Sequence, residues 1–194
     1  MTHILLTNDD GIHAAGLKAL AAGLAGFATI SVVAPHREQS GAAQSLTLRQ
    51  PIICNQVGER EWSVEGTPAD AVIVALHRLL PEPPDLVISG INFGANLGEN
   101  VYYSGTVGAA REAALHHIPA IAMSLCSKAP GVKFEPAGFK ATQPIDIARL
   151  LGWRSVGNEV RKASERISAP LESQALHASF IPRRLQIARG PLNS

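Results

Sequence analysis

Short apolar runs alternate with amphipathic stretches along the first 126 residues, and this alternation constrains the fold more than any other feature. The run at 3–7 stops abruptly at an Asn-Asp-Asp-Gly turn, which is typical of a buried parallel strand. An Ala- and Leu-rich stretch at 14–24 has helical spacing, and a second β-branched run follows at 29–34. Strand, helix and strand in this order predict a right-handed βαβ unit.

The next segments extend this unit into a doubly wound, mostly parallel α/β sheet. Thr67 is a suitable N-cap, and Pro68 fits the first position of a helix. Partial alternation at 45–54 and 61–64 predicts a β-rich hairpin inserted into the sheet, with Gly58 near its turn. The remaining predicted elements are a helix from Thr67 to Leu80, strands at 85–89 and 119–125, and a helix at 106–117.

Charge divides the 194 residues into two segments. Residues 1–126 hold 11 acidic and 6 basic side chains, whereas residues 127–194 hold 5 acidic and 11 basic ones. We expect 1–126 to form the core with the catalytic site. We expect 127–194 to be a basic, atypical C-terminal segment that is partly disordered. A basic segment could bind nucleic acid, but this one lacks interleaved aromatic residues and a binding motif, so no nucleic-acid partner is expected.

Several classes of protein are excluded by what the sequence lacks. The N-terminus has no basic region before its apolar run, and no run of 18 apolar residues exists, so we expect a cytoplasmic protein with no membrane partner. Cys54 and Cys126 are the only cysteines, and they form neither a disulfide framework nor a zinc motif. The P-loop and dinucleotide-binding glycine patterns are both absent.

Asp9 and Asp10 are the sharpest candidates for a functional site. Two adjacent carboxylates at the end of a strand repel each other, and a bound cation would offset that repulsion. Carboxylate, hydroxyl and amide oxygens favour Mg²⁺, Mn²⁺ or Ca²⁺ over zinc. The alternative is an ordinary Asn-Asp-Asp-Gly turn that caps the next helix.

Polar residues also follow the other predicted parallel strands, at the edge where such sheets bind ligands. The loop at 90–105 is rich in Gly and Asn and leads into Ser104, Gly105 and Thr106. These three residues precede a predicted helix, where backbone amides can bind an anion. The alternative is a flexible surface loop. A hard metal beside an anion site would suit hydrolysis of a phosphate ester.

Four motifs together resemble the SurE family of metal-dependent 5′/3′-nucleotidases. The match covers about residues 3–125, and the C-terminal third is not recognised. The motifs are TNDDG at 7–11, APHREQSGA at 34–42, GTPADAV at 66–72 and SGINFGANLGENVYYSGTVGAA at 89–110.

The resemblance implies a Rossmann-like core that hydrolyses nucleoside 5′-monophosphates to nucleoside and phosphate, with 3′-nucleotides and short polyphosphate as further substrates. It implies one divalent ion, Mg²⁺ or Mn²⁺, and a homodimer or tetramer. The implied site comprises metal ligands Asp9, Asp10, Ser40 and Asn92; phosphate-binding residues Asn96, Ser104, Gly105 and Thr106; and catalytic residues Asp9, Asp10 and Asn96. The alternative is an inactive or catalytically impaired relative that still binds metal or nucleotide, because the C-terminal third departs from the family pattern.

Overall fold

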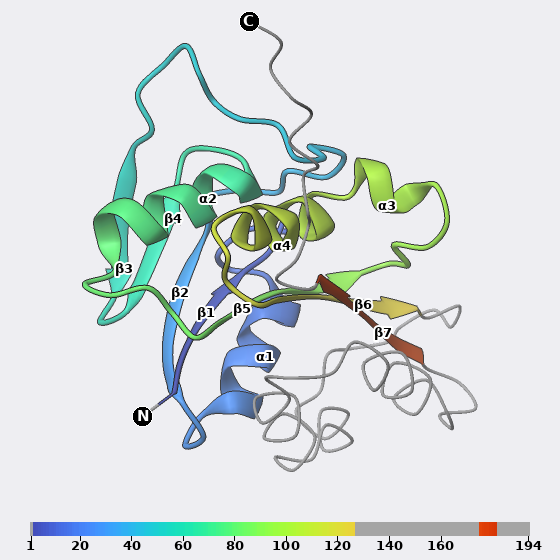
Figure 1. Ribbon diagram of the computed structural model, residues 1–194, viewed down its shortest axis with the longest axis horizontal. Helices are drawn as coiled ribbons and strands as arrows, with labels where there is room; N and C mark the ends of the chain where they lie inside the picture. Colours follow the sequence, from blue (N-terminus) through green and yellow to red (C-terminus); the bar gives the residue numbers. More distant parts are fainter. Residues whose placement is uncertain (1, 127–174, 182–194) are drawn as a thin grey trace, which may run out of the picture.

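Seven strands form one twisted sheet in the computed structural model, which describes residues 2–126 and 175–181 (Figure 1). Their order across the sheet is β3-β4-β2-β1-β5-β6-β7. The strands β1, β2, β4, β5 and β6 run parallel to their neighbours, whereas β3 and β7 pair antiparallel at the two edges. The strands are β1 (His3–Thr7), β2 (Thr29–Pro35), β3 (Cys54–Gly58), β4 (Glu61–Val64), β5 (Leu86–Phe93), β6 (Ala120–Cys126) and β7 (Ala175–Ile181).

Helices cover both faces of the sheet, as a doubly wound fold requires. In Figure 1, α1 lies on one side of the sheet, and α2 and α4 lie on the other. One apolar cluster packs α1 against β1 and β5, and a second packs α2 and α4 against the opposite face. The helices are α1 (Ala15–Leu24), α2 (Pro68–Val74), the π-helical turn η1 (Ala75–Leu79), α3 (Asn100–Tyr103) and α4 (Gly105–Leu115). The predicted α/β class and doubly wound sheet are confirmed.

The strand order defines a topological switch point, which is where such folds bind ligands. From β1 the chain proceeds outward to β2 and β4, and it then crosses back to β5 and β6 on the other side. The topological switch point therefore lies between β1 and β5. The chain leaves these two neighbouring strands toward helices on opposite faces of the sheet. Residues that follow β1 and β5 therefore lie at this switch point.

Several element boundaries differ from the predicted ones. The hairpin is present, but its first strand spans only Cys54–Gly58, and most of 45–54 lies outside any strand. β5 continues past the predicted end at Ser89. Gly90 permits this because it has no Cβ: one there would lie 2.3 Å from the carbonyl oxygen of Met123 on β6. The short helix α3 lies within the stretch predicted as a loop.

The strand β7 comes from the predicted C-terminal segment, where the sequence pattern predicts no strand. It pairs antiparallel with the full length of β6, from Ala120 opposite Ile181 to Cys126 opposite Ala175. The other predictions for 127–194, including partial disorder, lie outside the described residues. Among residues 2–126 and 175–181, no helix has the length and apolar character needed to cross a bilayer.

Candidate active site

The turn after β1 is tied to the loop after β2. The side chain of Asn8 donates to the carbonyl of Gly11 at 3.0 Å and accepts from its amide at 3.2 Å. Gly11 has a φ of +98°, and a Cβ there would lie 3.2 Å from the backbone of Arg37. The amide of Gln39 donates to the carbonyl of Asp9 at 2.7 Å. The carboxyl ends of β1 and β2 are therefore held together by backbone contacts.

Asp9 lies against the N-terminus of α4. Its side chain is buried, and Thr106, which is fully buried, donates a hydrogen bond from its hydroxyl to the carboxylate. Burial raises the pKa of Asp9, while hydrogen bonds from the Thr106 side chain and from backbone amides including that of Gly105 lower it. A Cβ at Gly105 would lie 2.8 Å from the Cβ of Asp9, so glycine permits this close approach. The start of α4 thus fixes the position of one carboxylate.

Asp10 is half-buried beside two other carboxylates. Burial, together with the negative charges of Asp9 and Glu38, raises the pKa of Asp10 to about 6, although a hydrogen bond from the backbone of Phe93 opposes the rise. Glu38 lies in the loop after β2, and the sequence pattern predicts no role for it. The sequence signal that could have identified Glu38 is its position after β2, the parallel strand next to β1. Three carboxylates near one edge of the sheet create a local negative field that a cation would relieve.

The predicted metal ligands come from β1 and both of its neighbours. Asp9 and Asp10 follow β1, Ser40 follows β2, and Asn92 lies on β5. Ser40 is exposed and donates to Glu38 Oε1 at 2.6 Å, and the half-buried Asn92 donates from Nδ2 to the carbonyl of Gly94 at 2.9 Å.

Every one of these four side chains offers oxygen, so the donor set fits a hard divalent ion. Within 2–126 and 175–181, no three His, Cys, Asp or Glu side chains group as a metal cluster. The identity of the four ligands stays a prediction.

The predicted phosphate-binding residues fall into two groups. Ser104 is the N-cap of α4, and its hydroxyl accepts from the amide of Val107 at 3.2 Å. Gly105 and Thr106 are directed toward Asp9, as described above. Asn96 lies further along, where its Nδ2 donates to Ser124 Oγ on β6 at 2.7 Å. The structure thus brings Gly105 and Thr106 onto the carboxylate, and it links Asn96 to the end of the next strand.

Two buried hydroxyls near the site have no predicted role. Thr7 and Ser89 are fully buried and pair in register on β1 and β5. Neither hydroxyl has a hydrogen-bond partner among the described residues. Thr7 is the last residue of β1 and lies two positions before Asp9. A polar residue at the end of an apolar strand is the only sequence signal for such a position.

These features define a class of protein: a doubly wound α/β fold with an acidic, oxygen-rich site at its topological switch point, beside the N-terminus of a helix. A family model described as "Survival protein SurE" matches residues 4–175. The chain belongs to the SurE family. The match extends about 50 residues beyond the region that the sequence motifs cover.

Two curated relatives are identical to this chain at about half of the aligned residues. A protein named 5′-nucleotidase SurE from Geotalea daltonii is 52% identical over 149 residues, which are 77% of this chain and 60% of that protein. One of the same name from Citrifermentans bemidjiense is 53% identical over 134 residues, 69% of this chain and 54% of that protein. The crystal structure of the SurE protein from Aquifex aeolicus has a TM-score of 0.72 and 38% identity, covering 80% of this chain and 62% of that one. The chain therefore spans a little over half the length of these relatives.

Proposed function

We propose that this chain is a metal-dependent phosphomonoesterase that hydrolyses nucleoside 5′-monophosphates to nucleoside and phosphate. Nucleoside 3′-monophosphates and short polyphosphate are its proposed further substrates. The observation that carries the proposal is the buried carboxylate of Asp9, held by Thr106 at the N-terminus of α4 with Asp10 next to it. Proteins about half identical to this chain are named 5′-nucleotidases, which supports the same activity. We place the catalytic core in residues 1–126.

Asp9, Asp10, Ser40 and Asn92 would hold one divalent ion, Mg²⁺ or Mn²⁺. Such an ion, when bound, supplies Lewis acidity toward the phosphoryl group and lowers the pKa of water. The chain itself supplies rigidity: Thr106 and the start of α4 fix Asp9, so little reorganisation is needed when charge develops. Ser40 is exposed and Asn92 is half-buried, so these two proposed ligands are open to solvent whereas Asp9 is buried.

The phosphate group would lie between α4 and the loop that carries Asn96. The positive end of the α4 dipole, at Ser104, Gly105 and Thr106, favours an anion there. Asn96 is already oriented by its bond to Ser124, and its amide could donate to a phosphate oxygen and so hold the phosphorus atom in position for attack by water. Asn96 is therefore the third proposed catalytic residue, beside the two aspartates.

The test is phosphate release from a panel of nucleoside 5′- and 3′-monophosphates and short polyphosphate, with Mg²⁺ or Mn²⁺. We expect release that EDTA abolishes and that Asp9→Ala lacks. Equal release in EDTA or in the variant would contradict the proposal. Thermal stabilisation by metal without any phosphate release would instead support an inactive binding relative.

A homodimer or tetramer and a cytoplasmic location are also proposed, and both rest on family membership. Size-exclusion chromatography with light scattering tests the assembly: a monomeric mass at micromolar concentration would contradict it. Fractionation of cells that produce the chain tests the location.

A further inference from the structure

One face of α4 touches both halves of the candidate site. Gly105, Gly108 and Glu112 share this face, because they are spaced three and four residues apart along the helix. Gly105 meets Asp9, as described above. Gly108 and Glu112 meet the segment 39–47, called the strap here, which follows β2 and carries Ser40.

The strap approaches α4 so closely at Gly108 that no other residue fits. A Cβ at Gly108 would lie 2.1 Å from the carbonyl oxygen of Ala43 and 3.1 Å from the Cα of Gln44. Ala43 has a φ of +52°, which L residues rarely adopt, and its amide donates to the carbonyl of Tyr103 at 3.1 Å. The backbone at Ala43 is therefore defined by its contact with the helix.

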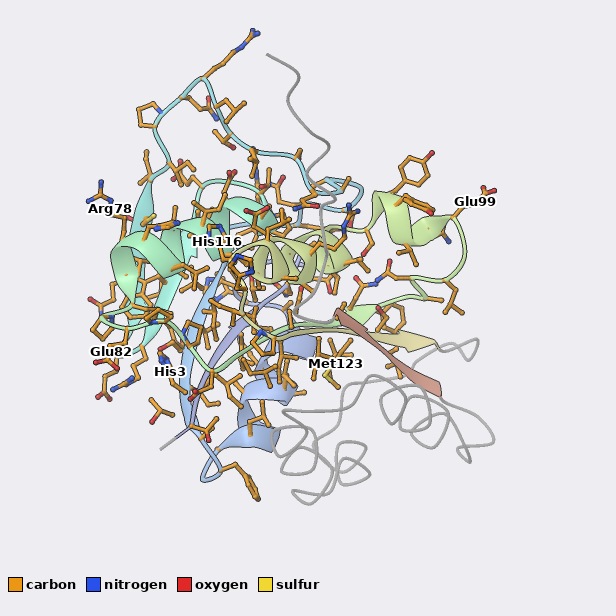
Figure 2. All side chains as sticks on the ribbon, viewed as in Figure 1. His3, Arg78, Glu82, Glu99, His116 and Met123 are labelled. Carbon is orange, nitrogen blue, oxygen red and sulfur yellow. The ribbon has the colours of Figure 1, made fainter. Side chains whose placement is uncertain are left out.

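Glu112 holds the strap one turn further along. Its side chain is buried, and its Oε2 accepts from Gln44 Nε2 at 2.8 Å. Its Oε1 lies 3.3 Å from Nε2 of His116, whose ring makes an edge contact with His77 of η1 (Figure 2). Both carboxylate oxygens of Glu112 are thus engaged, which fixes the direction of its bond to the strap.

Ser40 lies between two anchors of the strap. On one side, Gln39 donates to the carbonyl of Asp9, and on the other, Ala43 is pressed onto Gly108. The amide of Ala42 donates to the carbonyl of Gln39 at 3.1 Å and closes a turn around Ser40. Displacing the α4 anchor would therefore move the hydroxyl of Ser40 relative to Asp9.

We propose that Gly108 and Glu112 are positioning residues, which act through the strap to place Ser40 for metal binding. The proposal rests on the proposed function, because Ser40 is one of the proposed metal ligands. Neither residue would touch the metal or the substrate. Outer partners that orient metal ligands commonly contribute about 10- to 100-fold to metal affinity.

The experiment is calorimetric titration of the full chain with Mn²⁺, without nucleotide. We expect Glu112→Ala and Gly108→Ala to weaken Mn²⁺ binding about tenfold or more. Glu112→Gln should retain near-normal affinity, because its amide oxygen can still accept from Gln44. Arg111→Ala, an exposed change on the same helix, is the matched control and should leave affinity unchanged.

A double-mutant cycle with Ser40→Ala separates positioning from general stability. If Glu112 acts through Ser40, Glu112→Ala should cause little further loss of Mn²⁺ affinity in the Ser40→Ala chain. An equal loss in both backgrounds would overturn the proposal, and so would a lower melting temperature with unchanged Mn²⁺ affinity. Gln44→Leu tests the same contact from the strap side, should α4 variants fail to fold.

The same measurements distinguish failure of the proposed nucleotidase activity from failure of the positioning proposal. Wild-type chain that binds Mn²⁺ but releases no phosphate would contradict the nucleotidase and leave the positioning result intact. A wild-type chain that does not bind Mn²⁺ would overturn both proposals.

Discussion

The two sides of the candidate site differ in how firmly the fold holds them. On the α4 side, Asp9 is buried, bonded to Thr106 and packed against Gly105. On the opposite side, Ser40 is exposed and lies on the strap, which is held by backbone contacts at Gln39 and Ala43 and not by a buried bond of Ser40 itself. The difference indicates that the buried side is preformed by the core, whereas the exposed side depends on peripheral contacts. Substitutions on the two sides should therefore produce different effects.

The largest effect is expected for Asp9→Ala on the buried side. Removing the carboxylate removes a proposed metal ligand and leaves the Thr106 hydroxyl without its acceptor, so phosphate release should fall roughly 10²- to 10³-fold or more. The measurement is kcat/KM for a nucleoside monophosphate with saturating Mn²⁺. The His13→Ala control, an exposed change near the site, should retain activity. An Asp9→Ala chain within threefold of wild type would show that the buried side is not catalytic.

Gly105→Ala should damage the buried side through packing. The added Cβ would meet Asp9 at 2.8 Å and Pro68 at 3.1 Å, and overpacking of this kind costs about 1–3 kcal/mol of unfolding free energy. Denaturant unfolding measures it, with the exposed Leu115→Ala on the same helix as control. Unchanged stability in Gly105→Ala would mean that Asp9 and α4 can move apart freely.

Ser40→Ala should weaken the binding of Mn²⁺ and leave the free energy of unfolding unchanged. Because Ser40 is exposed, the free energy of unfolding without metal should stay within about 0.5 kcal/mol of wild type. Loss of one proposed ligand should weaken Mn²⁺ binding about tenfold, which corresponds to about 1.4 kcal/mol. Calorimetry and denaturant unfolding on the same preparation separate the two quantities. A large stability loss with unchanged affinity would reverse the contrast between the two sides.

The smallest effect on the free energy of unfolding is expected for Thr7→Val, at the end of β1. The Thr7 hydroxyl is buried without a partner among the described residues, so a methyl group of similar size should leave stability unchanged or slightly higher. Thr106→Val is the contrasting variant, because its hydroxyl bonds a carboxylate, and it should lose about 1–3 kcal/mol. Equal losses in both would indicate that Thr7 also has a bonding role.

Local signals in the sequence predict much of this architecture. The apolar runs predict β1, β2 and β6 close to their observed positions, and the Thr67 side chain forms the expected cap by accepting from the amide of Asp70 at 3.1 Å. The candidate site could be predicted for the same reason, since strand ends in a parallel sheet meet at one edge. Asp9 and Asp10 need no long-range information to be recognised as an acidic strand end.

What could not be predicted depends on long-range contacts. The strand β7 is defined by pairing with β6, which is distant in sequence, and its own residues carry only a weak pattern. β5 extends through Gly90 because the backbone of Met123 lies against it, and no local rule predicts that approach. The contacts of Gly108 and Glu112 with the strap likewise join segments more than 60 residues apart. The carboxylate of Glu38 is associated with Asp10 only once β1 and β2 are side by side.

The most direct test of the central claim is a Mn²⁺ titration of phosphate release by the full chain, compared with Asp9→Asn. Asparagine keeps the size of the side chain and one oxygen, so it removes the charge with little change in packing. The account predicts release from a nucleoside 5′-monophosphate that rises with Mn²⁺ and is reversed by EDTA in the wild type, and that is nearly absent in Asp9→Asn. Release that is independent of Mn²⁺, or equal in the two chains, would contradict it.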